Sequence, residues 1–285
     1  MPVHAGGDLS PTGIPVISGM AKKTSRRRAA PKSRAQRSNG SDVVATARRE
    51  LAAAFRWAAR LGFHEGTCNH FSLKVPGRED RYLINPHGRH FSEIKASDLA
   101  MLDADGNMVE GKYPVEPTAF FIHSRIHRAN ADAKCVLHTH MPYATALTML
   151  EGTRLEPCLQ TCLKFYGRVA YDEDSGGYGG LVLDEEEGDR LARALSGKRV
   201  LMLANHGVIV AAPSVAEAFN DLYYLERAAQ AQVLAMSTGR KLKLVGDNVA
   251  VKTRDQMEKD GPLYARLHFE ALCRILDRES PGYAR

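Results

Sequence analysis

Two short segments of the chain carry histidines whose spacing suits a divalent-metal site. The first, residues 135–140, is an apolar run that ends in His138 and His140, at positions i and i+2. Residues with this spacing point to the same side of an extended strand, so both imidazoles can reach one ion. The second segment, residues 199–207, is an apolar run that ends in Asn-His206-Gly, whose glycine permits a tight turn just after the imidazole.

Three neutral imidazoles with one coordination position left open are typical of a catalytic rather than a structural metal site. We therefore predict that His138, His140 and His206 bind one divalent ion. The alternative is that two strand ends carry solvated histidines. The sequence contains no nucleotide-binding loop and no nucleophile elbow that would indicate a different chemistry.

The composition is that of a globular protein without a membrane span. A chain of 285 residues suits one large domain or two small ones, and its hydrophobic content of 44% is ordinary. No apolar stretch reaches the roughly 18 residues that cross a bilayer, and the N-terminal residues lack the apolar region of a signal peptide. The five cysteines, an odd number, favour reduced thiols and a cytoplasmic location.

The positive charge of the chain is concentrated at its N-terminus. Residues 1–40 contain eight Lys or Arg and one acid, Asp8, so they carry +7 of a total net charge of +6, and residues 41–285 carry −1. This segment is rich in Pro, Gly, Ser and Ala and almost free of aromatic residues, which predicts a disordered tail. Its basic run could contact nucleic acid, but a solvated leader is the more common role of such a run.

The hydrophobic pattern after residue 41 predicts helices and strands in irregular alternation, which excludes a doubly wound parallel sheet. Ser214 and Glu217 form a capping box before a long helix. Extended segments are expected at 71–75, 82–85, 100–103, 135–138, 165–171, 199–204 and 208–212, with a turn at 105–107. Helices are expected at 43–61, 119–128, 142–150, 185–195, 215–236 and 261–277.

Four motifs together resemble the class II aldolase/adducin family, in its adducin-like bacterial branch. They are Glu-Gly-Thr-Cys-Asn-His-Phe-Ser at 65–72, Ile-Asn-Pro-His-Gly at 84–88, His-Thr-His at 138–140 and Asn-His-Gly at 205–207. The resemblance covers residues 43 to 240. It implies a three-layer α/β/α domain with a largely antiparallel sheet, assembled as a homotetramer. We expect this domain at 41–250, after the tail at 1–40 and before a helical extension at 251–285.

The resemblance also implies a site. In the sugar-phosphate aldolases of the family, the positions of His138, His140 and His206 bind zinc, and Asn69 and Gly88 fall in the substrate loops. The metal ion in such enzymes stabilises the enolate that forms when a carbon–carbon bond breaks. Manganese and Fe(II) suit the same ligands, so the sequence does not select the metal.

Other positions depart from the aldolase pattern. The family's catalytic Glu would fall at Ala119, whereas the nearest acid, Glu116, lies three residues earlier. The serines that hold a sugar phosphate would fall near Pro117 and Thr118, and proline offers neither an N–H nor a hydroxyl. We therefore expect a substrate that lacks a phosphate, with Glu116 as an acid/base candidate whose register is displaced.

Three further side chains have two interpretations each. Tyr166 could donate a proton across a subunit boundary, as a tyrosine does in the aldolases, although its position does not align clearly. His123 and His127, at i and i+4, imitate a metal-ligand pair, but we expect them to pack or to support the metal histidines.

The predicted function is a metal-dependent lyase that performs aldol cleavage or decarboxylation of a small hydroxy- or oxo-acid. One alternative is a non-catalytic, adducin-like interaction module. The other is an Fe(II)-dependent oxygenase that uses the same three histidines.

Overall fold

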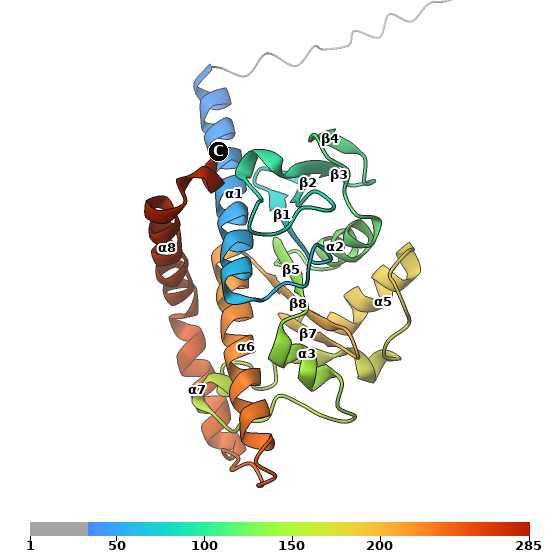
Figure 1. The fold of residues 1–285 in the computed structure, drawn as a ribbon, viewed down its shortest axis with the longest axis vertical. Helices are drawn as coiled ribbons and strands as arrows, with labels where there is room; N and C mark the ends of the chain where they lie inside the picture. Colours follow the sequence, from blue (N-terminus) through green and yellow to red (C-terminus); the bar gives the residue numbers. More distant parts are fainter. Residues whose placement is uncertain (1–33) are drawn as a thin grey trace, which may run out of the picture.

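The computed structural model describes the backbone of residues 34–285 and the side chains of residues 42–285. An eight-stranded sheet forms the centre of this region, in the order β4-β3-β2-β1-β5-β8-β7-β6 (Figure 1). All neighbouring strands are antiparallel except β6 and β7. The strands are β1 (His70–Val75), β2 (Arg78–Ile84), β3 (Ala100–Asp103), β4 (Met108–Glu110), β5 (Cys135–Thr139), β6 (Val169–Tyr171), β7 (Val200–Leu203) and β8 (Gly207–Ala212).

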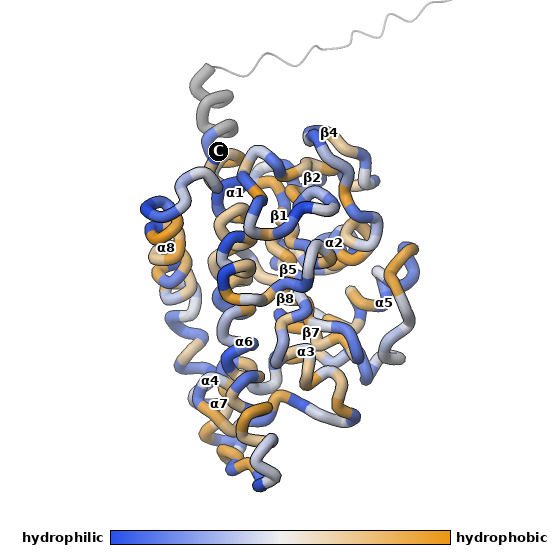
Figure 2. The backbone as a smooth tube through the Cα atoms, viewed as in Figure 1, coloured by the Kyte–Doolittle hydropathy of each residue, from blue (hydrophilic) through white to orange (hydrophobic). Residues whose placement is uncertain are grey.

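Helices cover both faces of the sheet, which gives three layers. One face carries α1 (Arg34–Leu61), α3 (Pro142–Thr148), α6 (Val215–Met236) and α8 (Gly261–Glu279), and the other carries α2 (Pro117–Ala129) and α5 (Glu185–Leu195). The short α4 (Gln160–Leu163) and α7 (Asp247–Lys259) lie beside each other near the lower end of the view in Figures 1 and 2. No helix of residues 34–285 is long and apolar enough to cross a membrane.

The sheet is buried on both sides by separate apolar clusters. Along β5, Cys135 and Leu137 face the cluster under α1 and α6, whereas Val136 faces the cluster under α2 and α5. Alternate residues of a strand point to opposite faces, so His138 shares the α2 side with Val136. Figure 2 shows hydrophobic and hydrophilic residues alternating along α8, as expected for a helix with one buried side.

These elements confirm the predicted α/β architecture and its largely antiparallel sheet. The Ser214 hydroxyl accepts a hydrogen bond from the backbone N–H of Glu217, as predicted for the capping box. Two boundaries differ from the sequence analysis. Helix α1 begins at Arg34, inside the segment predicted as a tail, and the expected strand at 165–171 is reduced to β6 because residues 164–168 turn. Residues 1–33 of that predicted tail lie outside the described part of the chain.

The C-terminal helices continue the main domain. The boundary expected at residue 250 falls inside α7, and Phe269, Leu272 and Leu276 of α8 are buried in the same cluster as α1 and α6. The domain limits from the sequence therefore stay a prediction, but the α8 helix contributes to the core rather than extending away from it.

A buried carboxylate fixes the start of the helix that follows His140. The side chain of Glu226 in α6 accepts hydrogen bonds from the backbone N–H groups of Tyr143 (2.9 Å) and Ala144 (2.8 Å), in the first turn of α3. These N–H groups have no partner within their own helix, and Pro142 occupies the first helical position, where no N–H is needed. Burial raises the pKa of Glu226, and the two N–H donors offset part of that cost.

We expect Glu226→Ala to lower the free energy of unfolding by about 2 kcal/mol, because it leaves two backbone donors at a buried helix start without an acceptor. Urea denaturation measures this difference. The matched control is Glu270→Ala, which removes an exposed acid paired with Arg266 and should cost less than about 0.5 kcal/mol. Equal stability of the two variants would contradict the capping role of Glu226.

Candidate metal centre

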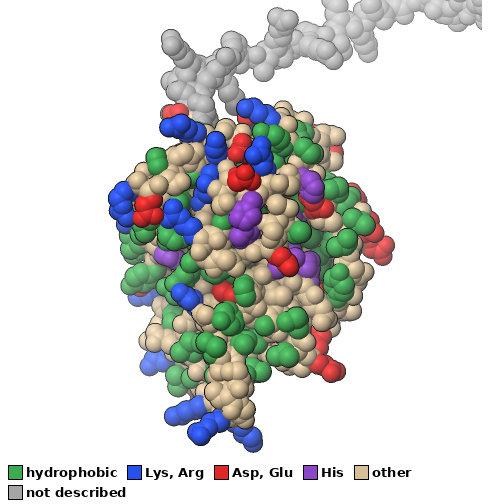
Figure 3. Space-filling model, in the orientation of Figure 1, with side chains coloured by type: hydrophobic (Ala, Val, Ile, Leu, Met, Phe, Trp, Pro, Cys, Tyr) green, Lys and Arg blue, Asp and Glu red, His purple; other side chains and the backbone are tan. Residues whose placement is uncertain are grey.

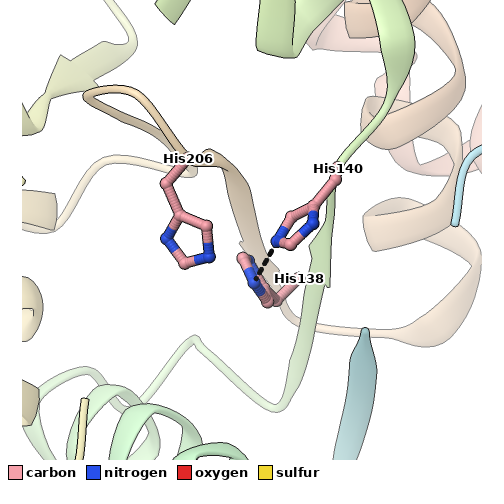
Figure 4. Close-up of side chains that lie close together, drawn as sticks. All are labelled: His138, His140 and His206. Carbon is pink, nitrogen blue, oxygen red and sulfur yellow. Dashed lines mark hydrogen bonds between the residues drawn. The ribbon is translucent and has the colours of Figure 1, made fainter. Parts of the chain in front are cut away.

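Three histidines from two connections of the sheet lie together, as the sequence predicted. His138 is in β5, His140 follows the end of that strand, and His206 lies in the turn between β7 and β8. Each offers a ring nitrogen, and these atoms all lie within 4.8 Å of one another. Figure 4 shows the three rings converging on one space.

Hydrogen bonds fix which nitrogen each of two rings presents to that space. The Nδ1–H of His138 donates to the backbone carbonyl of Val208 at 3.0 Å. The Nδ1 of His140 lies 2.5 Å from the carboxylate Oε2 of Glu65. Since a carbonyl and a carboxylate accept hydrogen bonds, both Nδ1 atoms carry a hydrogen, and in the neutral form of each ring the Nε2 keeps a lone pair.

The two lone pairs face each other. The Nε2 atoms of His138 and His140 are 3.2 Å apart, the contact drawn as a dashed line in Figure 4. Two neutral acceptors gain nothing from this approach unless a positive charge lies between them. Nitrogen ligands at about 2.0–2.1 Å from a tetrahedral ion are separated by roughly 3.3 Å. The donor set therefore fits a divalent metal ion.

The same burial keeps the rings in the form that binds metals. Loss of hydration, together with the neighbouring histidines, holds the pKa of His138 well below its usual range. Burial, reinforced by His140, lowers the pKa of His206 to about 4. Metal ligation requires neutral imidazole, and these rings are neutral at pH 7 before any ion binds.

The Asn-His-Gly turn depends on close packing at its glycine. A Cβ at Gly207 would lie 2.6 Å from the backbone oxygen of Thr139 and 2.7 Å from Cδ2 of His140. The residue with left-handed backbone in this turn is Asn205, with φ of 54°. The glycine therefore lets β8 approach the His140 ring, whereas the sequence analysis assigned it only the tight turn.

Asn69 and Gly88, the predicted substrate-binding residues, have different surroundings. The Asn69 Oδ1 accepts hydrogen bonds from the backbone N–H groups of Glu65 (2.7 Å) and His140 (3.4 Å), which joins it directly to the histidine cluster. Its Nδ2 is buried and has no hydrogen-bond partner among the described residues. At Gly88 a Cβ would meet no atom within 4 Å, so the backbone borders open space.

Glu116 lies nearer to the histidine cluster than expected from its position in the sequence, three residues before Ala119. It is the N-cap of α2, and its Oε2 accepts from the backbone N–H of Ala119 (3.0 Å), the position expected for the catalytic acid. The same oxygen lies 3.9 Å from Nε2 of His70, whose ring centroid is 4.9 Å from that of His138. An N-cap side chain folds back over the first helical turn, which explains how a residue three positions early reaches this place.

The tyrosines lie in less direct positions. The Tyr166 hydroxyl donates to Asp247 at the start of α7 (2.7 Å), among exposed groups of the helical layer, and the structure does not bring it to the histidines of its own chain. The Tyr178 ring centroid lies 6.1 Å from that of His206, and the Tyr178 side chain is about half exposed. Sequence reasoning missed Tyr178, because it lies in the acidic, Gly-rich loop with no periodic pattern.

Glu65 and His70 were also missed as site residues, although both lie in the quoted 65–72 motif. The signal was available for Glu65, since metal-ligating histidines commonly donate their second N–H to a carboxylate. For His70 the signal required the pairing of β1 with β5, in which His70 is directly opposite His138. His123 and His127 support this layer from α2, because His123 Nε2 is 3.0 Å from His70 Nδ1.

The surface near these residues mixes histidines with acids. Figure 3 shows histidine side chains reaching the surface on the face drawn there, with acidic side chains beside them. The Glu65 carboxylate is such an exposed group, with 70% of its side chain accessible, whereas His140 next to it is only 15% accessible.

Comparisons with known proteins agree with the geometry. A protein of Caulobacter vibrioides named as a class 2 aldolase is 37% identical over 84% of this chain and 91% of its own length. The decarboxylase NovR of Streptomyces niveus is 33% identical over 79% of this chain and 84% of its own length. The crystal structure of an aldolase II superfamily protein from Pseudomonas syringae superposes with a TM-score of 0.80 and 36% identity, covering 88% of this chain and all of that one.

The family model named Class II Aldolase and Adducin N-terminal domain matches residues 49–233. This range includes all eight strands and the three clustered histidines. The relatives cover most of their own lengths as well as most of this chain, so the likeness is not confined to the site. The chain belongs to the class II aldolase/adducin family.

Proposed function

We propose that the protein is a divalent-metal-dependent lyase that cleaves a carbon–carbon bond in a small hydroxy- or oxo-acid, by aldol cleavage or decarboxylation. The observation that carries the proposal is the close approach of the Nε2 atoms of His138 and His140, 3.2 Å apart, with His206 completing the cluster. The similarity to the decarboxylase NovR supports the reaction class.

His138, His140 and His206 would hold the metal ion, with zinc favoured and manganese or Fe(II) suited to the same ligands. When bound, such an ion supplies a Lewis acid for the negative charge that develops on the substrate carbonyl. Asn69 would orient the substrate, because its Nδ2 is a buried donor without a partner among the described residues. The backbone at Gly88 would line the space beside it.

The acid/base group is assigned to Glu116. Its carboxylate lies beside His70 and is about one-quarter exposed, so it borders both the cluster and solvent. A carboxylate in this place can accept a proton from a substrate hydroxyl and return it to the carbon that leaves. Tyr166 is the proposed proton donor across a subunit boundary in a homotetramer, and Tyr178 is the candidate within the same chain.

The substrate is proposed to lack a phosphate group. Pro117 has no N–H to offer an anion. The Thr118 hydroxyl donates its hydrogen to Glu116, so it is not available to a phosphate group. The two positions that would hold a sugar phosphate in the aldolases are therefore unsuited to that role.

We expect His206→Ala to lose stoichiometric metal, because the two remaining imidazoles leave the ion half-ligated. Elemental analysis of the purified protein measures the metal content. The matched control is His268→Ala, which removes a half-buried histidine that contacts Asn220 and should keep the full equivalent. A full equivalent in His206→Ala would show that the ligands are misassigned.

Glu65→Gln should weaken metal binding by about 10- to 100-fold, because it removes the charge that holds the His140 Nδ1–H and strengthens its Nε2 as a ligand. Competition with a chromogenic chelator measures this affinity. Glu151→Gln, at an exposed acid in a different loop, is the control and should bind as the wild type does. Unchanged affinity in Glu65→Gln would contradict the orienting role.

A substrate screen with zinc, manganese and Fe(II) tests the reaction. Unphosphorylated 2-oxo and hydroxy acids should be cleaved and sugar phosphates should not. Turnover of a sugar phosphate alone would overturn the substrate class. Oxygen uptake with Fe(II) and a 2-oxo acid would identify an oxygenase, and purified protein without stoichiometric metal would favour the adducin-like module.

A further inference from the structure

A chain of buried polar groups runs behind the metal centre, from β1 across to α2. It contains His70 and Ser72 of β1 and His123 and His127 of α2, all of them at most 4% exposed. The chain ends at the backbone carbonyl of Ala133. None of these groups belongs to the three-histidine cluster, and the reaction proposed above uses none of them.

The far end of the chain fixes the direction of its hydrogen bonds. His127 Nδ1 lies 2.5 Å from the carbonyl oxygen of Ala133, which can only accept, so Nδ1 carries the hydrogen. Burial lowers the pKa of His127 to about 3, so the ring is neutral and its Nε2 is an acceptor. The Ser72 hydroxyl, 2.7 Å from that Nε2, must therefore donate to it.

The same logic continues toward the metal centre. The Ser72 hydroxyl has one hydrogen, already used, so at 2.5 Å it accepts from His123 Nδ1. Burial holds the pKa of His123 well below its usual range, so its Nε2 is an acceptor for the Nδ1–H of His70, 3.0 Å away. The Nε2 of His70 therefore carries no hydrogen, and its lone pair is not used within the chain of hydrogen bonds.

This last atom faces the site. His70 is directly opposite His138 in the sheet, and its Nε2 is 3.9 Å from Glu116 Oε2. The hydrogen bond that the His70 ring forms with the described residues is at Nδ1, and its Nε2 forms none, although only 5% of the side chain is exposed. His70 lies outside the group of nitrogens that could share one ion.

We propose that His70 contacts the substrate directly, its Nε2 accepting a hydrogen bond from a hydroxyl group next to the substrate carbonyl. Ser72, His123 and His127 are positioning residues that hold His70 in the Nδ1–H tautomer. The inference rests on the proposed function, and it narrows the substrate class to acids that carry a hydroxyl. A site that offers a fixed acceptor discriminates against an analogue that lacks the donor, because the acceptor is then left unpaired.

The first test is made on the metal-free protein, where it does not depend on the reaction. Selective 15N-histidine labelling and solid-state NMR should show His70 with a protonated Nδ1 and an unprotonated Nε2. In Ser72→Ala the link to His127 is broken, and a population with protonated Nε2 should appear. Protonated Nε2 in the wild type, or an unchanged tautomer in Ser72→Ala, would overturn the relay.

The second test compares glycolate with acetate, which differs by the missing hydroxyl, on zinc-loaded protein by calorimetry. His70→Phe should bind glycolate about tenfold more weakly than the wild type, the loss expected for one hydrogen bond, and acetate equally well. The zinc content of the same samples should stay at one equivalent.

Loss of zinc from His70→Phe, with zinc retained by the wild type, would show that His70 is a metal ligand and would overturn the inference. Equal binding of glycolate by both proteins, including no binding by either, would overturn it as well. Absence of zinc from the wild type would instead contradict the proposed function, and the tautomer measurement still decides the relay.

Discussion

The site depends on the pairing of β5 with a strand on each side. Pairing with β1 places His138 opposite His70. Pairing with β8 places Thr139 opposite Val208, and the backbone carbonyl of Val208 accepts the hydrogen bond from His138 Nδ1. A shift of either pairing by one residue would turn these side chains to the opposite face, into the apolar cluster under α1. The strand register therefore decides both the ligand geometry and the residue behind it.

Burying several imidazoles in one layer requires that each remain neutral and find a partner. Burial lowers the pKa of His70 and His127 to about 3, so neither carries a charge that the interior would have to solvate. Their N–H groups donate within the layer, and the chain of bonds has an acceptor at its end. Near the cluster, the Nε2 of His70 and the Nδ2 of Asn69 form no hydrogen bond with residues 42–285. These two atoms differ from the rest because a ligand can complete them.

Local patterns in the sequence were sufficient to single out the three clustered histidines and most elements. The His-x-His spacing, the Asn-His-Gly turn and the alternation of apolar residues are properties of short segments, and the structure brings those three histidines together. The helix α7 falls mostly in the expected helical extension at 251–285 but was not predicted as a separate helix. It is polar, with Ala250 as its buried residue, and so offers no apolar period to detect. The turn at 164–168 was likewise missed because it overlaps the segment 165–171, which was predicted as extended.

The surroundings of the three histidines could not be predicted because they depend on contacts between distant segments. Glu116 was placed by counting along the chain, but its position is set by a side chain that folds over its own helix. His70 acquires a role only once β1 is aligned with β5. The family includes different reactions around a common fold, so the three histidines alone do not select one. In the proposed reaction, the selection would fall to the groups that touch the rest of the substrate: a carboxylate at Glu116, a donor at Asn69 and an acceptor at His70.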